Sequence, residues 1–412
     1  MYRNFRGAIM ATALLAISAP ALAEPITLEQ AVARALAATP QRAADQAAVD
    51  AARGARNQAS VRPNPVITVE AEDALGTGPF SALSQAQLTG SYSQTIERGG
   101  KRQARVALAE REIGVAEAVG GVNRLTIAAE TQRAFIDVLI ADAQLQIATG
   151  RLEIERGLQA EAVRRVRGYK DPLFVETAAE RRVIEAEVAV EQIRSKRSAA
   201  AALLASFWGG DPENLEPQGD LLAITYDGLA LAEADSVLAE AELERARAAI
   251  ALERSRVAQD YTWSAGGRLL RETGDVALVA SITIPLGRTN RNEGNIARAE
   301  AERRRLEAQV EVDRQNRLRR LTNLIANAEA ARQRATRLVI EVYPLNTRTL
   351  EQVREGYNRG GFTFQNVQDA ADATIATQNE WLEAITEYRD LLTEIDRLTG
   401  RFAAAAQQEI LP

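Results

Sequence analysis

The sequence repeats itself, and this repeat limits the fold more than any other feature. Four matches, two of single residues and two of dipeptides, recur at a nearly constant offset of 188 to 191 positions. The pairs are Ile96 with Ile284, Ala109-Glu110 with Ala299-Glu300, Gly168-Tyr169 with Gly356-Tyr357, and Gly209 with Gly400. Regular self-similarity indicates duplication, so the two halves are expected to share one layout.

Each half is predicted to contain a helix, two strands, a long helix, a tight turn and a returning helix. In the first repeat, residues 24–210, the strands lie at about 65–74 and 87–97 and the turn at 168–173. A linker at 211–228 follows. In the second repeat, residues 229–400, the strands lie at about 259–270 and 276–286 and the turn at 356–362, before a tail at 401–412.

The strands are predicted from alternation with a period of two. In "VITVEAE", for example, Ile67, Val69 and Ala71 share one face. Four strands form an open sheet whose two edges must be covered. Two interpretations remain: two soluble hairpins that cap a helical bundle, or a share of a barrel that several subunits close.

The long helices are the second constraint. No Pro occurs from Lys101 to Asp171, and a helix over 101–167 spans roughly 100 Å. Its apolar residues recur at steps of seven in two registers, so it is expected to pack on two sides, as in a closed ring of helices. A long soluble coiled coil has the same periodicity and stays an alternative. In the second repeat Pro344 is predicted to kink or break the helix.

The first 23 residues are predicted to be a secretory signal. Arg3 and Arg6 precede a short apolar run, and "ALA" at 21–23 provides small residues for cleavage. The alternative is an uncleaved anchor. After residue 23 no run of 18 apolar residues occurs, so no membrane helix is predicted.

The amino-acid composition argues against several kinds of site and partner. The chain has no Cys and no His, and its two Met, Met1 and Met10, lie inside the signal. Disulfides, thiol lipidation and ordinary zinc or copper sites are therefore not expected. The net charge of −6 makes nucleic acid an unsuitable partner. The carboxylates are spread along the predicted helices at i,i+3 and i,i+4 spacings, where they form ion pairs with basic side chains and keep the helix surface hydrated. They form no catalytic constellation, so neither an enzyme nor a cofactor is predicted.

Three motifs carry a resemblance to a known family. "QTIERGGKR" at 94–102, "IPLGRTNRNEGNIARAE" at 284–300, and Pro344 followed by "GYNRGGFTFQNVQDA" at 356–370 resemble TolC-type outer-membrane efflux factors. The match covers nearly the whole mature chain. It is similar to the heavy-metal branch, which serves cobalt-zinc-cadmium or copper-silver exporters of the resistance-nodulation-division type.

The resemblance implies an α+β membrane protein that forms a homotrimer. Each subunit would give four strands to one twelve-stranded outer-membrane β-barrel and its helices to one twelve-helix periplasmic α-barrel. The family fold would place five apolar side chains toward lipid: Ile67, Val69, Trp263, Leu278 and Ile282. Tyr92, Tyr261 and Trp263 would be interfacial aromatics. The strand-to-helix junctions would comprise Gly99, Gly100, Lys101, Pro285, Gly287, Asn292 and Gly294.

The resemblance also implies two functional surfaces on the helices. The turns would dock a periplasmic membrane-fusion adaptor through Gly168, Tyr169, Pro172, Leu173, Gly356, Tyr357, Gly360, Gly361 and Phe362. Asp369 would line a pore constriction, with Asn366 at a position where the family often has a second acid. Helix reversal is expected to rely on the glycines of the turns.

The implied function is that of a passive exit duct, reached from an inner-membrane pump through the adaptor. The protein would sit in the outer membrane of a Gram-negative bacterium and extend into the periplasm, without lipid on a thiol. A multidrug or type I secretion outlet of the same fold is one alternative. A soluble periplasmic coiled-coil adaptor or scaffold is the alternative from another class.

Overall fold

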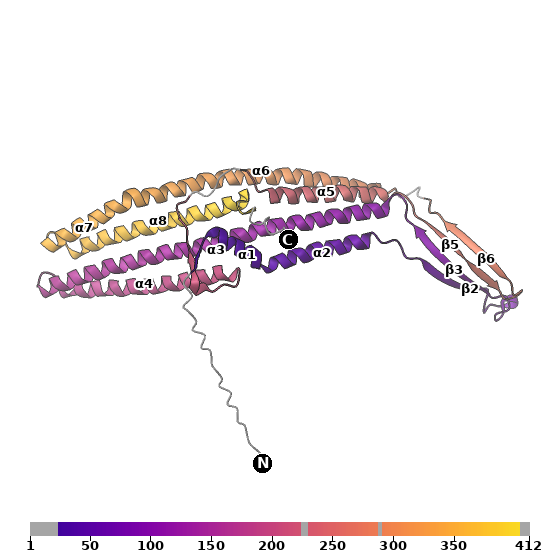
Figure 1. The fold of residues 1–412 in the computed structure, drawn as a ribbon, viewed down its shortest axis with the longest axis horizontal. Coiled ribbons are helices and arrows are strands. Elements are labelled where there is room, and N and C mark those ends of the chain that lie inside the picture. The colour runs from indigo at the N-terminus through magenta and orange to yellow at the C-terminus, as the bar shows by residue number, and fades with distance from the viewer. Residues whose placement is uncertain (1–23, 224–229, 287–290, 404–412) are drawn as a thin grey trace, which may run out of the picture. The chain divides into compact units, whose positions relative to one another are not determined.

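The computed structural model describes residues 24–223, 230–286 and 291–403 (Figure 1). The predicted signal and Gly287 therefore lie outside the described residues. From the first half come α1 (Leu28–Ala38), α2 (Pro40–Ala59), β2 (Val66–Glu72), β3 (Gln87–Ile96), α3 (Lys101–Arg167) and α4 (Leu173–Ser206). From the second half come α5 (Glu233–Ser255), β5 (Tyr261–Leu270), β6 (Val276–Thr283), α6 (Glu293–Arg337), the π-helical turn η3 (Leu338–Val342), α7 (Tyr343–Arg359) and α8 (Phe364–Thr399).

Several elements differ from the sequence-based expectation. The first helical segment is two helices, because Thr39 caps α2 and Pro40 occupies its first turn. Two further strands, β1 (Glu24–Ile26) and β4 (Leu215–Pro217), form a small parallel sheet. Three residues are too few to display an alternating pattern, which is why the sequence did not reveal them.

The two long helices are built differently. Helix α3 is continuous over 67 residues. Its counterpart is interrupted by η3, a five-residue π-helical turn that ends two residues before Pro344. Proline lacks the N–H for the helical ladder and clashes with the preceding turn, and π turns are one way to absorb that conflict. The helix is thus interrupted next to Pro344, as expected.

The chain divides into two compact units, each drawn from both halves of the sequence. Within the described ranges, the tip unit comprises residues 24–31, Ala134–Leu221 and Leu345–Gln378. The sheet unit comprises Val32–Arg133 and the described residues of 222–344 and 379–403. None of the helices in the described ranges is long and apolar enough to cross a membrane.

The sheet unit contains a four-stranded antiparallel sheet in the order β2-β3-β5-β6. Paired residues of neighbouring strands point to the same face. One row joins Ile67, Tyr92, Ala265 and Ala280, and the next row on that face joins Val69, Gly90, Gly267 and Leu278. One face is consequently apolar.

This apolar face is exposed, which is unusual for a sheet of this size. Leu278 is 94% exposed, and Ile67, Val69 and Ile282 are also exposed. Trp263 pairs with Ile282 on this face, and its ring lies 5.7 Å from that of Tyr92. All five side chains that the resemblance directs toward lipid therefore share one face.

The opposite face is polar and internally bonded. Arg268 donates from Nε to Oγ1 of Thr89 at 2.9 Å and from Nη2 to Oε2 of Glu72 at 3.2 Å. Ser264 and Ser281 share a hydrogen bond of 2.9 Å. A sheet with one solvated face and one apolar face needs an apolar environment on the second side.

Candidate functional site

The first strand-to-helix junction depends on two glycines. Gly99 and Gly100 have φ of +67° and +73°, a region that side chains other than glycine rarely adopt. A Cβ on Gly99 would also lie 2.4 Å from Cβ of Ala258. Lys101 begins α3, and its Nζ lies 2.8 Å from Oδ2 of Asp260. This tight turn lets the chain pass from β3 into α3 beside α5.

The second junction uses an asparagine in the same role. Asn292 has φ of +57°, and its Nδ2 donates to the carbonyl oxygen and to Oε2 of Glu253, each at 2.8 Å. The bond from Asn292 lowers the pKa of Glu253. Asparagine tolerates this backbone region because its short amide bonds locally. A Cβ on Gly294 would meet no atom within 4 Å, and Pro285 lies in exposed coil before α6. Packing therefore requires neither a glycine at 294 nor a proline at 285.

The first turn places apolar side chains in solvent. Helix α3 ends at Arg167, and Pro172 is the N-cap of α4. The left-handed residue is Tyr169, with φ of +57°, and not Gly168, which corrects the expected role of that glycine. Tyr169 is 98% exposed, and Leu173 is largely exposed as well.

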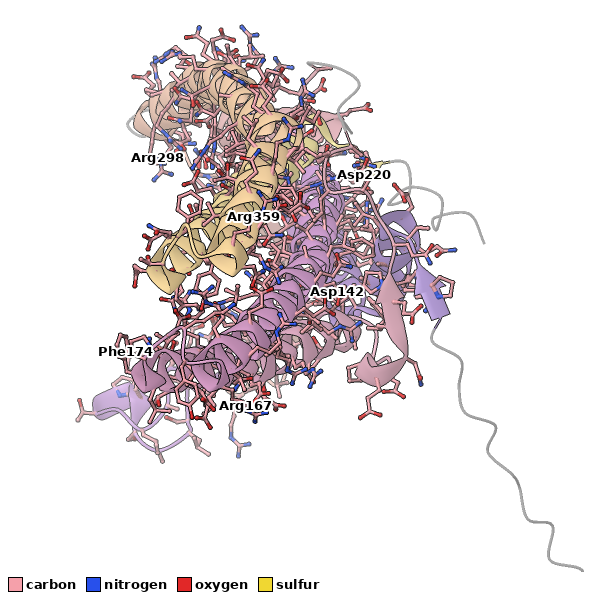
Figure 2. All side chains as sticks on the ribbon, turned by 90° about the vertical axis from the view of Figure 1, so that its left-hand side faces the viewer. Asp142, Arg167, Phe174, Asp220, Arg298 and Arg359 are labelled. Atoms are coloured by element: carbon pink, nitrogen blue, oxygen red, sulfur yellow. The ribbon has the colours of Figure 1, made fainter. Side chains whose placement is uncertain are left out.

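Phe174 belongs to the same surface and was missed from the sequence. It is 70% exposed, and Figure 2 shows it labelled beside the first turn, near Arg167. An apolar residue in the first turn of a helix usually packs into the core, whereas Phe174 is exposed. Its neighbour Leu173 was predicted to belong to the docking surface, so the position of Phe174 next to Leu173 was the available clue.

The second turn joins α7 to α8. Gly360 has φ of +86°, and its N–H donates to the carbonyl of Tyr357 at 2.9 Å. The N–H of Gly361 donates to the carbonyl of Gly356, also at 2.9 Å. Phe362 is 47% exposed. Its ring lies so close to Gly356 that a Cβ there would sit 2.2 Å from Cδ2, so Gly356 serves a close approach.

Substitutions at the two neighbouring glycines are expected to differ. Of the two glycines, Gly360 has the positive φ that a side chain would strain, and Gly361 does not. Gly360→Val should destabilise the turn by about 1–3 kcal/mol, because a β-branched residue is poorly accommodated in that region. Gly361→Val is the matched control and should cost less. Hydrogen exchange of residues 355–366 measures both, and equal effects would contradict the assignment.

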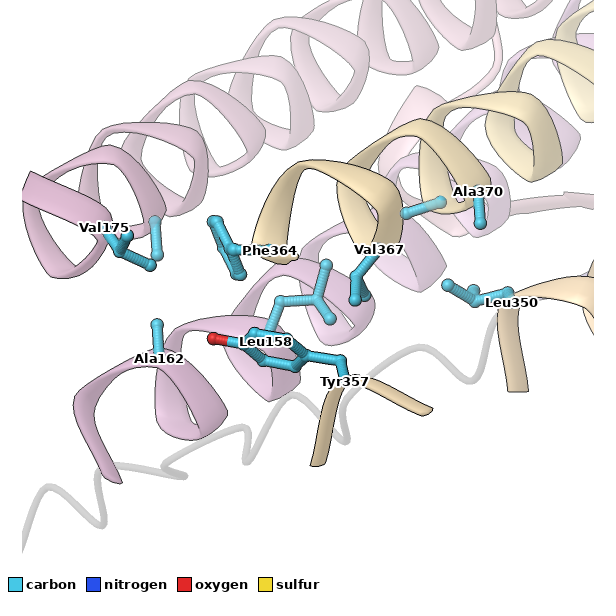
Figure 3. Packing of buried hydrophobic residues seen from close by; sticks show 10 residues of the cluster. Leu158, Ala162, Val175, Leu350, Tyr357, Phe364, Val367 and Ala370 are labelled. Atoms are coloured by element: carbon cyan, nitrogen blue, oxygen red, sulfur yellow. The ribbon is translucent and has the colours of Figure 1, made fainter. Parts of the chain in front are cut away.

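Tyr357 is not available to a partner in this structure, which corrects its expected place on the docking surface. It is fully buried among apolar side chains from α3, α4 and α8 (Figure 3). Its ring centroid lies 5.9 Å from that of Phe364. Aromatic pairs at this spacing stabilise a core, so Tyr357 holds the two turns together from inside.

A polar link completes this connection. Arg165 donates from Nε to Oδ2 of Asp171 at 2.8 Å and from Nη2 to Oδ1 at 3.1 Å. The hydroxyl of Tyr357 also donates to Oδ2 of Asp171. The hydrogen bonds from Arg165 lower the pKa of Asp171, and burial raises the pKa of Tyr357. Asp171 thus stays ionised and joins the first turn to the second.

Asp171→Asn is expected to loosen both turns at neutral pH. The variant leaves Arg165 without its bidentate partner, at a cost of about 1.5–3 kcal/mol, so amide exchange should accelerate by about 10- to 100-fold. Because the folded pKa of Asp171 lies below its unfolded value of about 3.9, the wild-type link should persist down to that pH and weaken below it. Exchange rates that are unchanged at pH 7 would contradict this role.

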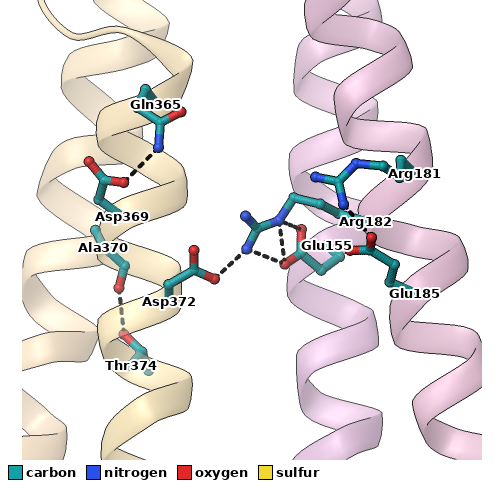
Figure 4. A network of polar contacts seen from close by, with 9 residues as sticks. All are labelled: Glu155, Arg181, Arg182, Glu185, Gln365, Asp369, Ala370, Asp372 and Thr374. Carbon is teal, nitrogen blue, oxygen red and sulfur yellow. Dashed lines mark hydrogen bonds and ion pairs between the residues drawn. The ribbon is translucent and has the colours of Figure 1, made fainter.

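Asp369 and Asn366 lie on the first turns of α8. Asn366 accepts from the N–H of Thr363 at 3.0 Å, and its own N–H donates to Oγ1 of Thr363 at 3.3 Å, a reciprocal helix cap. Asp369 is exposed and accepts from Nε2 of Gln365 at 2.7 Å (Figure 4). Asp369 remains open to solvent, so its predicted place in a constriction stays a prediction.

An ion-pair network around the buried Glu155 reaches the exposed Asp372, one turn further along α8, and was not predicted. Arg182 donates from Nε to both carboxylate oxygens of Glu155, at 3.1 and 3.2 Å, and from Nη2 to Asp372 (Figure 4). Glu155 is buried, so its charge requires this partner. The network connects the α3–α4 pair to α8 inside the tip unit. Within the described ranges, no group of three or more acidic, His or Cys side chains could hold a metal ion.

Comparisons with known proteins now bear on these surfaces. A family model described as "Outer membrane efflux protein" matches residues 31–210. The chain is 30% identical over 393 residues to the cobalt-zinc-cadmium resistance protein CzcC of Cupriavidus metallidurans, covering 92% of this chain and 91% of the relative. The chain belongs to the outer membrane efflux protein family.

Solved structures agree on the fold of this outer membrane efflux protein. It is similar to the outer membrane protein VceC of Vibrio cholerae, with a TM-score of 0.71 and 20% identity over 90% of this chain and 95% of that one. It is also similar to CusC, with a TM-score of 0.71 and 14% identity over 92% and 91%. The family is one of outer-membrane efflux channels, not of enzymes, and the α+β fold is that of these channels.

Proposed function

We propose that this protein is the passive exit duct of a tripartite export system that carries heavy-metal cations from the periplasm to the exterior. The observation that carries the proposal is the exposed apolar face of a four-stranded sheet whose strands continue into long helices. The similarity to a cobalt-zinc-cadmium resistance protein supports the choice of heavy metals.

The sheet edges support assembly into a trimer. Strands β2 and β6 each have one neighbour in the described sheet. In a bilayer every backbone group must be paired, so the edges of one copy would pair with those of others. Three copies would close a twelve-stranded barrel whose apolar face meets lipid.

The turns of the tip unit support docking of a periplasmic adaptor, and through it an inner-membrane pump. Apolar side chains exposed at such turns are best explained by a partner. Arg167 and Lys170 flank them and have no ion-pair partner within the described part of the chain. An adaptor surface with apolar and acidic side chains would complement this end.

The route to the outer membrane would begin with the secretory signal. Cleavage after Ala23 would leave Glu24 as the first residue, at the start of strand β1. The chain has no Cys, so thiol lipidation would not anchor it. The protein would then sit in the outer membrane of a Gram-negative bacterium and extend into the periplasm.

The purified duct is expected to bind no transition metal tightly. Outside the signal the chain lacks His, Cys and Met, the usual ligands of zinc and copper. Selectivity for metal would then belong to the pump and the adaptor. Calorimetry with zinc or copper tests this, and a stoichiometric site with a sub-micromolar Kd would overturn it.

Deletion and complementation test the proposed substrate. A strain that lacks the chain should become sensitive to zinc, cobalt, cadmium, copper or silver and should regain resistance with the wild-type chain. Sensitivity to organic toxins alone would favour a multidrug outlet, and loss of a secreted protein would favour a type I outlet. Release of the protein from cells without detergent would favour a periplasmic scaffold.

A further inference from the structure

The sheet unit contains a buried carboxyl group that the proposed duct does not use. Asp396, near the end of α8, is 1% exposed, and Gln132 on α3 is equally buried. Nε2 of Gln132 donates to Oδ2 of Asp396 at 2.7 Å. Arg401, just past the end of α8, donates from Nη1 to the same oxygen at 3.1 Å.

The remaining oxygens of this pair lack partners. Neither Oδ1 of Asp396 nor Oε1 of Gln132 has a hydrogen bond within the described part of the chain. Both atoms are acceptors when Asp396 is ionised, and a buried acceptor without a donor costs about 1–3 kcal/mol. A carboxylic acid and an amide can instead form two antiparallel hydrogen bonds, which would satisfy both atoms at once.

We propose that Asp396 keeps a proton in the folded protein at neutral pH and donates it from Oδ1 to Oε1 of Gln132. Solvent supplies this proton during folding, and the carboxyl becomes neutral. The pair is thus a buried proton-binding site between α3 and α8. It belongs to the sheet unit and is independent of which substrate the duct carries.

Burial and the polar groups around the site decide whether Asp396 is ionised or neutral. Burial favours the neutral form and is the largest influence, so the pKa of Asp396 is raised, although the hydrogen bond from Gln132 and the positive charges of Arg401 and Arg389 favour the ionised form. From α3 the site meets the uncharged Gln132. Asp235 at the start of α5 forms ion pairs with Arg317 and Arg397, whose Nη1 atoms lie 3.3 and 3.2 Å from its Oδ2.

Asp396→Asn tests the proposal on the full chain in detergent. The asparagine amide can donate to Gln132 and accept from it, as the neutral acid would. A raised folded pKa means that stability falls as pH rises above the unfolded value of about 3.9. We therefore expect the unfolding midpoint of the variant at pH 7 to equal or exceed that of wild type, with a flatter pH profile from 4 to 8.

The matched control is Asp171→Asn, the same substitution at a carboxylate held ionised by Arg165. It should lower the midpoint at pH 7. Infrared difference spectra between wild type and Asp396→Asn should also contain the band of a protonated carboxyl at pH 7. A midpoint that falls in both variants, or the absence of that band, would overturn the proposal and leave Asp396 as an ordinary ion-pair partner of Arg401.

Discussion

Val69→Arg should abolish accumulation of the protein in the outer membrane. Val69 lies within β2 on the exposed apolar face, in one row with Gly90, Gly267 and Leu278. If that face meets lipid, an arginine near the middle of the bilayer costs about 2–4 kcal/mol in each copy. Three copies would carry this cost together. Membrane fractionation with an antibody against the chain measures the result.

Thr68→Arg is the matched control. Thr68 precedes Val69 and points to the opposite, polar face, in one row with Ser91 and Gly266. An arginine there stays in a polar environment and should leave the abundance close to wild type. If both variants lose outer-membrane abundance equally, the strand tolerates no arginine on either face. If both keep the wild-type abundance, the apolar face does not meet lipid.

Leu173→Asp combined with Phe174→Asp should abolish export while the protein reaches the outer membrane in normal amounts. Both side chains are exposed beside the first turn and make little contact with the core of the tip unit. Losing two buried apolar contacts at an interface and desolvating two new charges costs several kcal/mol, enough to lower affinity more than 100-fold. Metal sensitivity of complemented cells and crosslinking to the adaptor report the loss.

Glu180→Ala serves as the control for the tip. Glu180 is exposed on α4 beyond the turn, so its removal should change neither export nor crosslinking. Full resistance in the double Asp variant, together with unchanged crosslinking, would show that the turns are not the docking surface. The search for that surface would then move along the exposed faces of the helices.

Much of the backbone could be predicted because local patterns determine it. Alternation located the four strands of the main sheet within a few residues, and the absence of Pro between Lys101 and Asp171 predicted an unbroken helix that the structure contains. The duplication predicted matching turns at 168–173 and 356–362. These features depend on neighbours in the sequence, so a single chain suffices to read them.

The arrangement of side chains within the turns could not be predicted, because it depends on contacts between distant segments. Gly-Tyr occurs in both turns, yet Tyr169 is exposed in the first and Tyr357 is buried in the second. The difference arises because Arg165 and Asp171, 192 and 186 residues away in the sequence, form hydrogen bonds with the second tyrosine. The pair of Gln132 and Asp396 is hidden for the same reason, since each residue alone resembles any polar helix residue.

The number of chains in the detergent-extracted complex tests the central claim most directly. Native mass spectrometry of the full-length protein after mild extraction should give the mass of three mature chains, because the free edges of β2 and β6 need partners. Each chain should start at Glu24 if the signal is cleaved. A single chain that stays monodisperse in detergent, with the strand content of the folded protein, would contradict the account.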